Sequence, residues 1–265
     1  MRRRKVLDIK RILTCLLVII FAGRIIWSSQ PVQAQQKSFP VTAVGDSLTY
    51  GVGDPTKRGG YCYLIQKPLK RATKQKVHVD NFGISGETSK QILKRVQSKD
   101  NLRQALKKSR IVIITAGGND VMHALRAQGL KLSQSQLLKY QDAYTANMNN
   151  MIKEIRSLNS RAPIYIYGIY NPYAIYFKKV PGMKMAIDNW NQNTRLLTQD
   201  YHRVHFVDIS ALAQPKKLQY SKKNQETTNP LLYTKDYFHP NRQGYQLMTD
   251  KLWKKLQATK TEWRP

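Results

Sequence analysis

VTAVGDSL, residues 41–48, carries the strongest structural signal in this chain. Its first four residues are apolar or β-branched and together have the length of a short β-strand. Gly45, Asp46 and Ser47 follow, and this composition is typical of a tight turn. A serine on a turn directly after a strand is presented to solvent, so we expect Ser47 to be accessible at the end of a strand.

The rest of the chain alternates apolar runs of strand length with amphipathic runs of helical length. Strands are expected at residues 41–44, 77–82, 110–116, 163–169 and 204–207, and helices at 61–73, 88–97, 133–158, 183–201 and 242–257. The run Ile111-Val112-Ile113-Ile114 is apolar throughout, as is typical of a strand buried on both faces of a parallel sheet. Strands that alternate with helices predict an α/β fold, a three-layer α/β/α sandwich around a five-stranded parallel sheet.

Polar or glycine-rich motifs follow the first three predicted strands. Ser47 comes directly after the first strand, Gly86 follows the second by one loop, and Gly117-Gly118-Asn119-Asp120 follows the third. Ligands of an open parallel sheet bind beyond the carboxyl ends of its strands. We therefore expect these residues to converge on one edge of the sheet.

An aspartate and a histidine three residues apart, Asp236 and His239, lie far downstream in the run DYFHP. Such a pair can face one pocket from a single turn. With Ser47 it supplies a nucleophile, a base and a group that orients the base, which is the set that acyl transfer through a serine requires. Asp46 adjoins the serine, but neighbours on a tight turn point apart, so we expect Asp46 to stabilise the turn.

Each of these motifs has a structural explanation when taken alone. Gly-Asp-Ser can simply end a strand, Asn119-Asp120 can cap a helix, and Asp-x-x-His is common in surface turns. Their joint occurrence in this order favours a catalytic interpretation. The α/β-hydrolase alternative requires Gly-x-Ser-x-Gly at a strand-to-helix elbow, and residues 83–87, Gly-Ile-Ser-Gly-Glu, lack the final glycine.

Four blocks of the sequence resemble those of the SGNH hydrolases, also called GDSL esterases and lipases. The blocks are GDSL at residues 45–48, ISGET at 84–88, GGND at 117–120 and DYFHP at 236–240. They occur in the family's order and span nearly all of the chain after residue 38. The resemblance implies a flavodoxin-like SGNH hydrolase fold and a serine esterase or lipase that hydrolyses carboxylic esters through an acyl-serine intermediate. With its basic N-terminal segment, the chain resembles a Gram-positive cell-surface branch of the family.

The resemblance also implies roles for individual residues. Ser47 would be the nucleophile, His239 the general base, and Asp236 the residue that orients the imidazole. The oxyanion hole would consist of the backbone N–H groups of Ser47 and Gly86 and the side-chain amide of Asn119. Neither a metal nor an organic cofactor is implied.

The substrate is expected to be a small ester or a lipid. We expect Tyr50, Tyr61 and Tyr173 to line the rim of the pocket and bind it. Tyr173 lies in an aromatic stretch, residues 170–177, expected to be a loop after the fourth strand. Ordinary aromatic packing explains the same residues equally well. The remaining histidines fall at unrelated places, and His202 and His205 lack a cysteine or carboxylate partner at ligand spacing, so no metal site is predicted.

Residues 1–37 differ from the rest of the chain. A basic head at positions 2–5 precedes an apolar run at 12–23, which is typical of a signal peptide or a signal anchor. Val32-Gln33-Ala34 offers the small residues that a signal peptidase requires, whereas a retained segment would act as a membrane anchor. Either interpretation places one SGNH hydrolase domain, residues 38–265, on the extracellular face of the membrane or outside the cell. Cys62 is then its only cysteine and is expected to be buried.

The chain is strongly basic, with a formal net charge of +29. Residues 1–37 hold eight Lys/Arg and one Asp, so the predicted domain keeps +22 of this charge. For an exported domain, anionic membrane lipid or cell-wall polymer is a more plausible partner than nucleic acid. A solvated basic surface without a partner explains the charge equally well.

Two other functions remain open on the same residues. A cell-surface protein that binds anionic wall polymer or lipid could use the scaffold without catalysis. An acyltransferase would use the same serine and histidine but pass the acyl group to a sugar or an alcohol instead of water.

Overall fold

The computed structural model describes residues 38–128, 134–172, 174, 183–215, 218–221 and 226–264. The chain divides into two units, residues 1–37 and 38–265, and all described residues belong to the second. The predicted signal segment and Tyr173 therefore lie outside the described residues, and the assignment of the two domains stays a prediction. No helix within the described ranges combines the length and the apolar character needed to cross a bilayer.

A five-stranded parallel sheet forms the centre of the second unit. Its strands lie in the order β2-β1-β3-β4-β5, all parallel to their neighbours. The bounds are β1 Ser38–Gly45, β2 Lys76–Gly83, β3 Ile111–Thr115, β4 Ile164–Tyr167 and β5 Val204–Val207. The α/β fold class and the five parallel strands expected from the sequence are thus confirmed. A small antiparallel hairpin, β6 (Gln219–Ser221) and β7 (Glu226–Thr228), was not expected.

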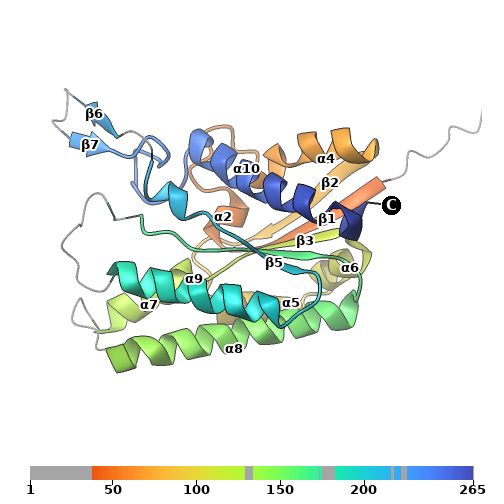
Figure 1. Ribbon diagram of the computed structural model, residues 1–265, viewed down its shortest axis with the longest axis horizontal. Helices are drawn as coiled ribbons and strands as arrows, with labels where there is room; N and C mark the ends of the chain where they lie inside the picture. The colour runs from red at the N-terminus through yellow and green to blue at the C-terminus, as the bar shows by residue number, and fades with distance from the viewer. Residues whose placement is uncertain are drawn as a thin grey trace, which may run out of the picture. The chain divides into compact units, whose positions relative to one another are not determined.

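Helices cover both faces of the sheet and complete the three layers (Figure 1). One face carries α3 (Tyr61–Leu64), α4 (Gln66–Thr73), α10 (Arg242–Ala258) and α11 (Lys260–Trp263). The other carries α5 (Ser89–Ser98), α6 (Asp100–Lys108), α7 (Gly118–Gln128), α8 (Gln134–Leu158) and α9 (Met183–Gln199). Two hydrophobic clusters result, one on each side of the sheet.

The apolar run of β3 divides its side chains between these two clusters. Ile111 and Ile113 pack into one cluster, and Val112 and Ile114 into the other. Successive side chains of a strand point to opposite faces, so a strand covered on both sides must be apolar at every position. This packing explains the unbroken β-branched sequence.

Two differences from the expected helices have local causes. The helix expected at residues 61–73 is interrupted at Ile65, since Pro68 has no N–H to donate to the Leu64 carbonyl. Sequence analysis also missed α6 and α7. In α6, Leu102 and Leu106 are buried four residues apart, a helical spacing that was present in the sequence.

Candidate active site

Ser47 is the first residue of a single-turn helix, α2 (Ser47–Tyr50), directly after β1. Asp46 caps this helix, because its Oδ1 accepts a hydrogen bond of 3.0 Å from the Leu48 N–H. The same oxygen accepts a bond of 2.8 Å from the Thr115 hydroxyl at the end of β3. The expected structural role of Asp46 is therefore confirmed, and its contacts fix the turn that carries Ser47. Ser47 is only 6% exposed, so the expectation of a solvent-accessible serine is wrong: its side chain lies in the wall of a pocket.

Gly45 allows the ends of β1 and β3 to approach closely at this turn. A Cβ atom added to Gly45 would lie 2.2 Å from the Thr115 hydroxyl oxygen. Only a glycine fits this position without displacing the Thr115 side chain, which itself holds Asp46.

The histidine of the last block reaches the serine of the first. His239 Nε2 lies 3.0 Å from Ser47 Oγ, although 192 positions separate the two residues in the chain. His239 Nδ1 lies 2.8 Å from Asp236 Oδ2. A serine, an imidazole and a carboxylate are thus aligned at hydrogen-bonding distances.

Asp236 also organises the turn that carries the histidine. Its Oδ1 accepts hydrogen bonds of 2.9 and 3.0 Å from the backbone N–H groups of Phe238 and His239. Tyr237, which lies between Asp236 and Phe238 in the chain, adopts a left-handed conformation with φ of 53°. Burial alone would raise the pKa of Asp236, but the hydrogen bonds from the His239 side chain and the two N–H groups hold it below its usual value. The carboxylate therefore stays ionised beside the imidazole.

The second block is bonded to the end of β1, and the third block is bonded to the second. The β1–β2 register places Gly83 opposite Gly45, and the Ile84 N–H donates to the Gly45 carbonyl at 2.9 Å. Asn119 Nδ2 then donates to the Glu87 carbonyl at 2.8 Å, which joins the third block to the second. An amide nitrogen carries two hydrogens, so this bond uses one of the two donors of Asn119.

Gly86 lies between these contacts in a left-handed conformation with φ of 86°. A Cβ atom built on it would have no described heavy atom within 4 Å. Its requirement for glycine is therefore conformational, and the space beside its backbone is open.

A largely buried ion pair supports the second block, and it was not predicted from the sequence. Arg95 Nη2 lies 2.6 Å from Glu87 Oε2, and their side chains are only 11% and 14% exposed. The guanidinium also donates to the carbonyls of Phe82 and Gly45, at 3.0 and 3.2 Å. One side chain thus connects the ends of β1 and β2 to the loop that bears Gly86. The only signal in the sequence is an arginine between the buried positions 92 and 96 of a predicted helix.

A half-buried carboxylate, Asp120, joins the second and third blocks. Asp120 accepts hydrogen bonds from the Ser89 N–H at 2.9 Å and from the Ser89 hydroxyl at 2.5 Å. Asn147 of α8 donates to the same hydroxyl at 3.0 Å. Burial raises the pKa of Asp120, and the bonds from Ser89 offset part of this shift.

A pocket open to solvent lies next to Ser47, with an empty volume of about 440 Å³ that includes the solvent at its mouth. Its walls come from four loops that follow strands and are mostly apolar. The lining residues are Asp46, Ser47, Leu48, Thr115, Ala116, Gly118, Asn119, Gly168, Ile169, Tyr170, Pro172 and Phe238.

The three tyrosines expected at the pocket rim have different outcomes. The expectation for Tyr61 is wrong: the residue is 0% exposed, and its hydroxyl lies 2.7 Å from Thr49 Oγ1 inside the core. Its ring packs edge-on against Tyr167, which explains why the aromatic side chain is there. Tyr50 is 60% exposed but is not among the residues that line the pocket, so its contact with substrate stays a prediction. Tyr173 lies outside the described residues.

The described residues contain no group of three or more His, Cys, Asp or Glu side chains that could hold a metal ion. His205 instead pairs with Glu262, with 2.7 Å between Nε2 and Oε2. Cys62 is buried as expected, and burial raises the pKa of its thiol to about 12.

Comparisons with known proteins agree with this site. The sequence profile of the GDSL-like Lipase/Acylhydrolase family matches residues 43–247. The chain is 30% identical over 229 residues to the uncharacterized protein YpmR of Bacillus subtilis (strain 168), covering 85% of this chain and 83% of that protein. It is 23% identical over 218 residues to the spore germination lipase LipC of Bacillus licheniformis, covering 80% of this chain and 93% of that protein.

Solved structures share the fold. The lipase Lip_vut3 from a goat rumen metagenome superimposes with a TM-score of 0.65 at 23% identity, covering 81% of this chain and 96% of that chain. A single-residue variant of Axe2, an acetyl xylan esterase from Geobacillus stearothermophilus, superimposes with a TM-score of 0.60 at 19% identity, covering 82% and 94%. The profile match spans most of the chain and includes all four blocks, and so the chain belongs to the GDSL-like lipase/acylhydrolase family of SGNH hydrolases.

Proposed function

We propose that the protein is a serine esterase that hydrolyses carboxylic esters through an acyl-serine intermediate. The observation that carries this proposal is the hydrogen-bonded series Ser47, His239 and Asp236, with donor–acceptor distances of 3.0 and 2.8 Å. These are the distances at which a base can take the proton of a serine nucleophile.

The first half-reaction forms the acyl-enzyme. Ser47 Oγ attacks the carbonyl carbon of the ester while His239 Nε2 accepts the hydroxyl proton, and the carbonyl π bond becomes an oxyanion. The intermediate collapses when the bond to the alcohol oxygen breaks and His239 passes its proton to that oxygen. Asp236, held ionised, stabilises the imidazolium during both steps.

The second half-reaction releases the acid. Water gives a proton to His239 Nε2 and attacks the acyl carbon, and the second tetrahedral intermediate expels Ser47 Oγ, which recovers its proton from the imidazolium. Every proton and electron pair is accounted for by these side chains and water. The proposed steps therefore require no metal and no organic cofactor.

The oxyanion is proposed to lie between the N–H groups of Ser47 and Gly86 and the side-chain amide of Asn119. The contact of Asn119 with the Glu87 carbonyl supports this assignment, since it brings the amide to the loop of Gly86. One such donor contributes about 3 kcal/mol to stabilisation of the transition state.

The substrate is proposed to be a small ester or a lipid with an apolar acyl group. Leu48, Ile169 and Tyr170 line the pocket beside Ser47, and apolar walls favour an acyl chain over a charged group. The proteins to which the chain is similar include a spore germination lipase and an acetyl xylan esterase, so the preferred acyl length has to be measured.

The protein is further proposed to act on the outer face of the membrane or outside the cell, with anionic lipid or wall polymer as a partner. The basic head and apolar run of residues 1–37 support export. The +22 charge of the remaining residues supports an anionic partner.

A panel of p-nitrophenyl esters of increasing acyl length tests the proposal. We expect hydrolysis by the full chain and a loss of at least about a thousandfold in kcat for Ser47→Ala, with an unchanged circular dichroism spectrum. Ser85→Ala is the matched control, because Ser85 is the serine that the α/β-hydrolase alternative would use.

Other results would point to the other functions. Hydrolysis that survives Ser47→Ala contradicts the proposed mechanism. Tight binding of teichoic acid, without hydrolysis at any acyl length, would show a binding protein. A new ester that forms with an added alcohol or sugar in preference to free acid would show an acyltransferase.

A further inference from the structure

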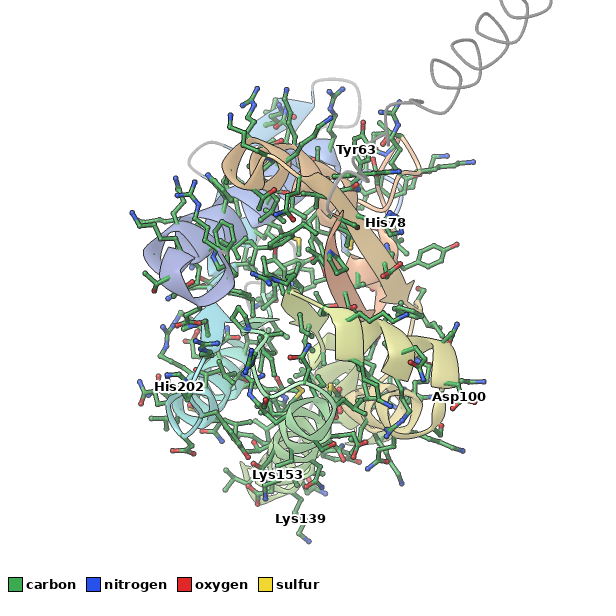
Figure 2. All side chains as sticks on the ribbon, turned by 90° about the vertical axis from the view of Figure 1, so that its right-hand side faces the viewer. Tyr63, His78, Asp100, Lys139, Lys153 and His202 are labelled. Carbon is green, nitrogen blue, oxygen red and sulfur yellow. The ribbon has the colours of Figure 1, made fainter. Side chains whose placement is uncertain are left out.

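The edge of the sheet opposite the Ser47 pocket carries a concentration of positive charge. Because the five strands are parallel, the segments that lead into them lie together at this edge. We define the amino-edge surface as the segments before β2, β3, β4 and β5 together with the C-terminal segment: residues 71–76, 107–110, 159–163, 200–203 and 259–264. Figure 2 views the molecule from this side and labels His202 on it.

Direct contacts place the C-terminal segment on this edge. Arg264 Nη2 donates to the Ala72 carbonyl at 3.0 Å, and Arg110 Nη2 donates to the Trp263 carbonyl at 3.2 Å. The Trp263 ring packs edge-on against Phe39 near the start of β1, with 6.2 Å between ring centroids. Segments from distant parts of the sequence therefore form one surface.

The charge of this surface differs sharply from that of the opposite edge. Its 25 residues include ten Lys/Arg and two acidic residues, Asp200 and Glu262. One of these acids, Glu262, already pairs with His205. The described residues of the segments that follow the strands hold three Lys/Arg and seven acidic residues in 59 positions: 46–60, 84–88, 116–120, 168–172, 174, 208–215, 218–221 and 226–241. The net basic charge of the domain is thus concentrated away from the pocket.

The lysines of the surface face solvent. Lys76, Lys107, Lys108 and Lys260 are exposed, and among the described residues no carboxylate lies within ion-pair distance of them. Four unpaired ammonium groups on one surface repel one another, and an anionic partner relieves this repulsion.

The chain enters the domain at the same edge. Ser38, the first described residue, pairs with Lys76 in the β1–β2 ladder. The 37 residues that precede it contain the basic head and apolar run that indicate a membrane tether. A tether would hold the domain near a bilayer, and the basic surface lies at the edge where the chain enters the domain.

We infer that the amino-edge surface docks on anionic phospholipid headgroups and that the Ser47 pocket then faces away from the bilayer. This inference rests on the proposed tether and not on ester hydrolysis. The eight residues of β1 separate the two edges by roughly 25 Å, well beyond the Debye length of about 8 Å at physiological ionic strength. Esters would therefore reach the pocket from the wall or the medium and not from the supporting membrane.

Fluorescence quenching on vesicles tests this orientation with the full chain. Cys15→Ser removes one cysteine and Cys62 is buried, so a dye can be placed on Thr261→Cys at the amino edge or on Lys57→Cys at the opposite edge. The vesicles contain a headgroup-nitroxide lipid in phosphatidylcholine, with or without phosphatidylglycerol. We expect several-fold stronger quenching of the dye at position 261 than at position 57. This difference should appear only when phosphatidylglycerol is present, and it should disappear at high salt.

Variants that neutralise lysines identify the residues responsible for docking on anionic vesicles. A basic side chain near an anionic membrane surface changes the affinity for that surface roughly fivefold. Neutralising four lysines should therefore lower the affinity for anionic vesicles by about two orders of magnitude or more. The test variant replaces four lysines of the surface: Lys76→Gln, Lys107→Gln, Lys108→Gln and Lys260→Gln. The matched control replaces four exposed lysines elsewhere: Lys67→Gln, Lys90→Gln, Lys94→Gln and Lys139→Gln.

Several outcomes would overturn the inference. One such outcome is equal quenching with and without phosphatidylglycerol, and another is stronger quenching at position 57 than at 261. Equal loss of vesicle binding in the test and control variants would also overturn it, as would failure of the full chain to float with any vesicle. Release by soluble polyglycerol phosphate at a lower phosphate concentration than by phosphatidylglycerol would assign the surface to wall polymer instead. Hydrolysis of a short ester by each variant reports on Ser47 separately, so failure of docking and failure of catalysis are distinguishable.

Discussion

Two carboxylates near Ser47 have pKa values shifted in opposite directions. Asp236 accepts hydrogen bonds from an imidazole and two N–H groups and has a lowered pKa. Asp46 is buried, and this burial raises its pKa despite hydrogen bonds from Thr115 and Leu48. The two residues therefore have different tasks: Asp236 keeps a charge beside the imidazole, and Asp46 holds the turn.

The raised pKa of Asp46 predicts a specific pH dependence. The pKa of this carboxyl is higher in the folded chain than in the unfolded chain, where it is about 3.9. Its contribution to the free energy of unfolding is therefore fully present at a pH below the unfolded-state pKa, and it is lost as the pH rises through the folded-state pKa. Asp46→Asn keeps an oxygen for the cap but does not titrate. We expect the unfolding free energy of the wild type, minus that of Asp46→Asn, to fall as pH rises above about 4 and then to level off. Urea unfolding across this range measures it, and an increase with pH would contradict the assignment.

Helix α5 connects the blocks of the site. It begins after the loop of Gly86 and returns Arg95 to the ends of β1 and β2. The strands and the main helices were predicted from local periodicity, and the proposed trio of Ser47, His239 and Asp236 came from motifs at strand ends and a family resemblance. The Arg95–Glu87 pair was not predicted from the sequence, because only the folded chain shows that Arg95 contacts a carboxylate and two backbone carbonyls.

The Arg95–Glu87 pair is expected to position Gly86 and Asn119 for catalysis. Arg95→Met should lower stability by about 3 kcal/mol, since it leaves the Glu87 carboxylate buried without its partner. It should also lower kcat at least tenfold with a smaller change in KM, because the displaced donors act on the transition state.

A double variant separates positioning from stability. Arg95→Met with Glu87→Met removes both buried charges and should recover much of the stability but not kcat. Chemical denaturation and steady-state kinetics measure the two quantities. If the double variant recovered both stability and kcat, the pair would have a structural role only. An unchanged kcat in Arg95→Met would exclude a role of the pair in positioning Gly86 and Asn119.

The central sheet separates two edges of different chemistry. Its carboxyl edge collects the four blocks of the site, as the parallel topology predicts, and its amino edge collects basic segments. The total charge could be read from the sequence but this separation could not, because the segments come from five places in the chain. Tyr61 illustrates the same limit: an aromatic residue near a motif reads as a rim residue until packing shows that it belongs to the core.

Mapping of a covalent adduct tests whether Ser47 is a nucleophile activated by His239. The full chain is treated with a p-nitrophenyl alkylphosphonate, which esterifies an activated serine, and the modified peptide is located by mass spectrometry. We predict one adduct, on Ser47, that is absent in Ser47→Ala and forms at least about a hundredfold more slowly in His239→Ala. An adduct on another serine, or rapid ester hydrolysis with Ser47 unmodified, would contradict this role of Ser47.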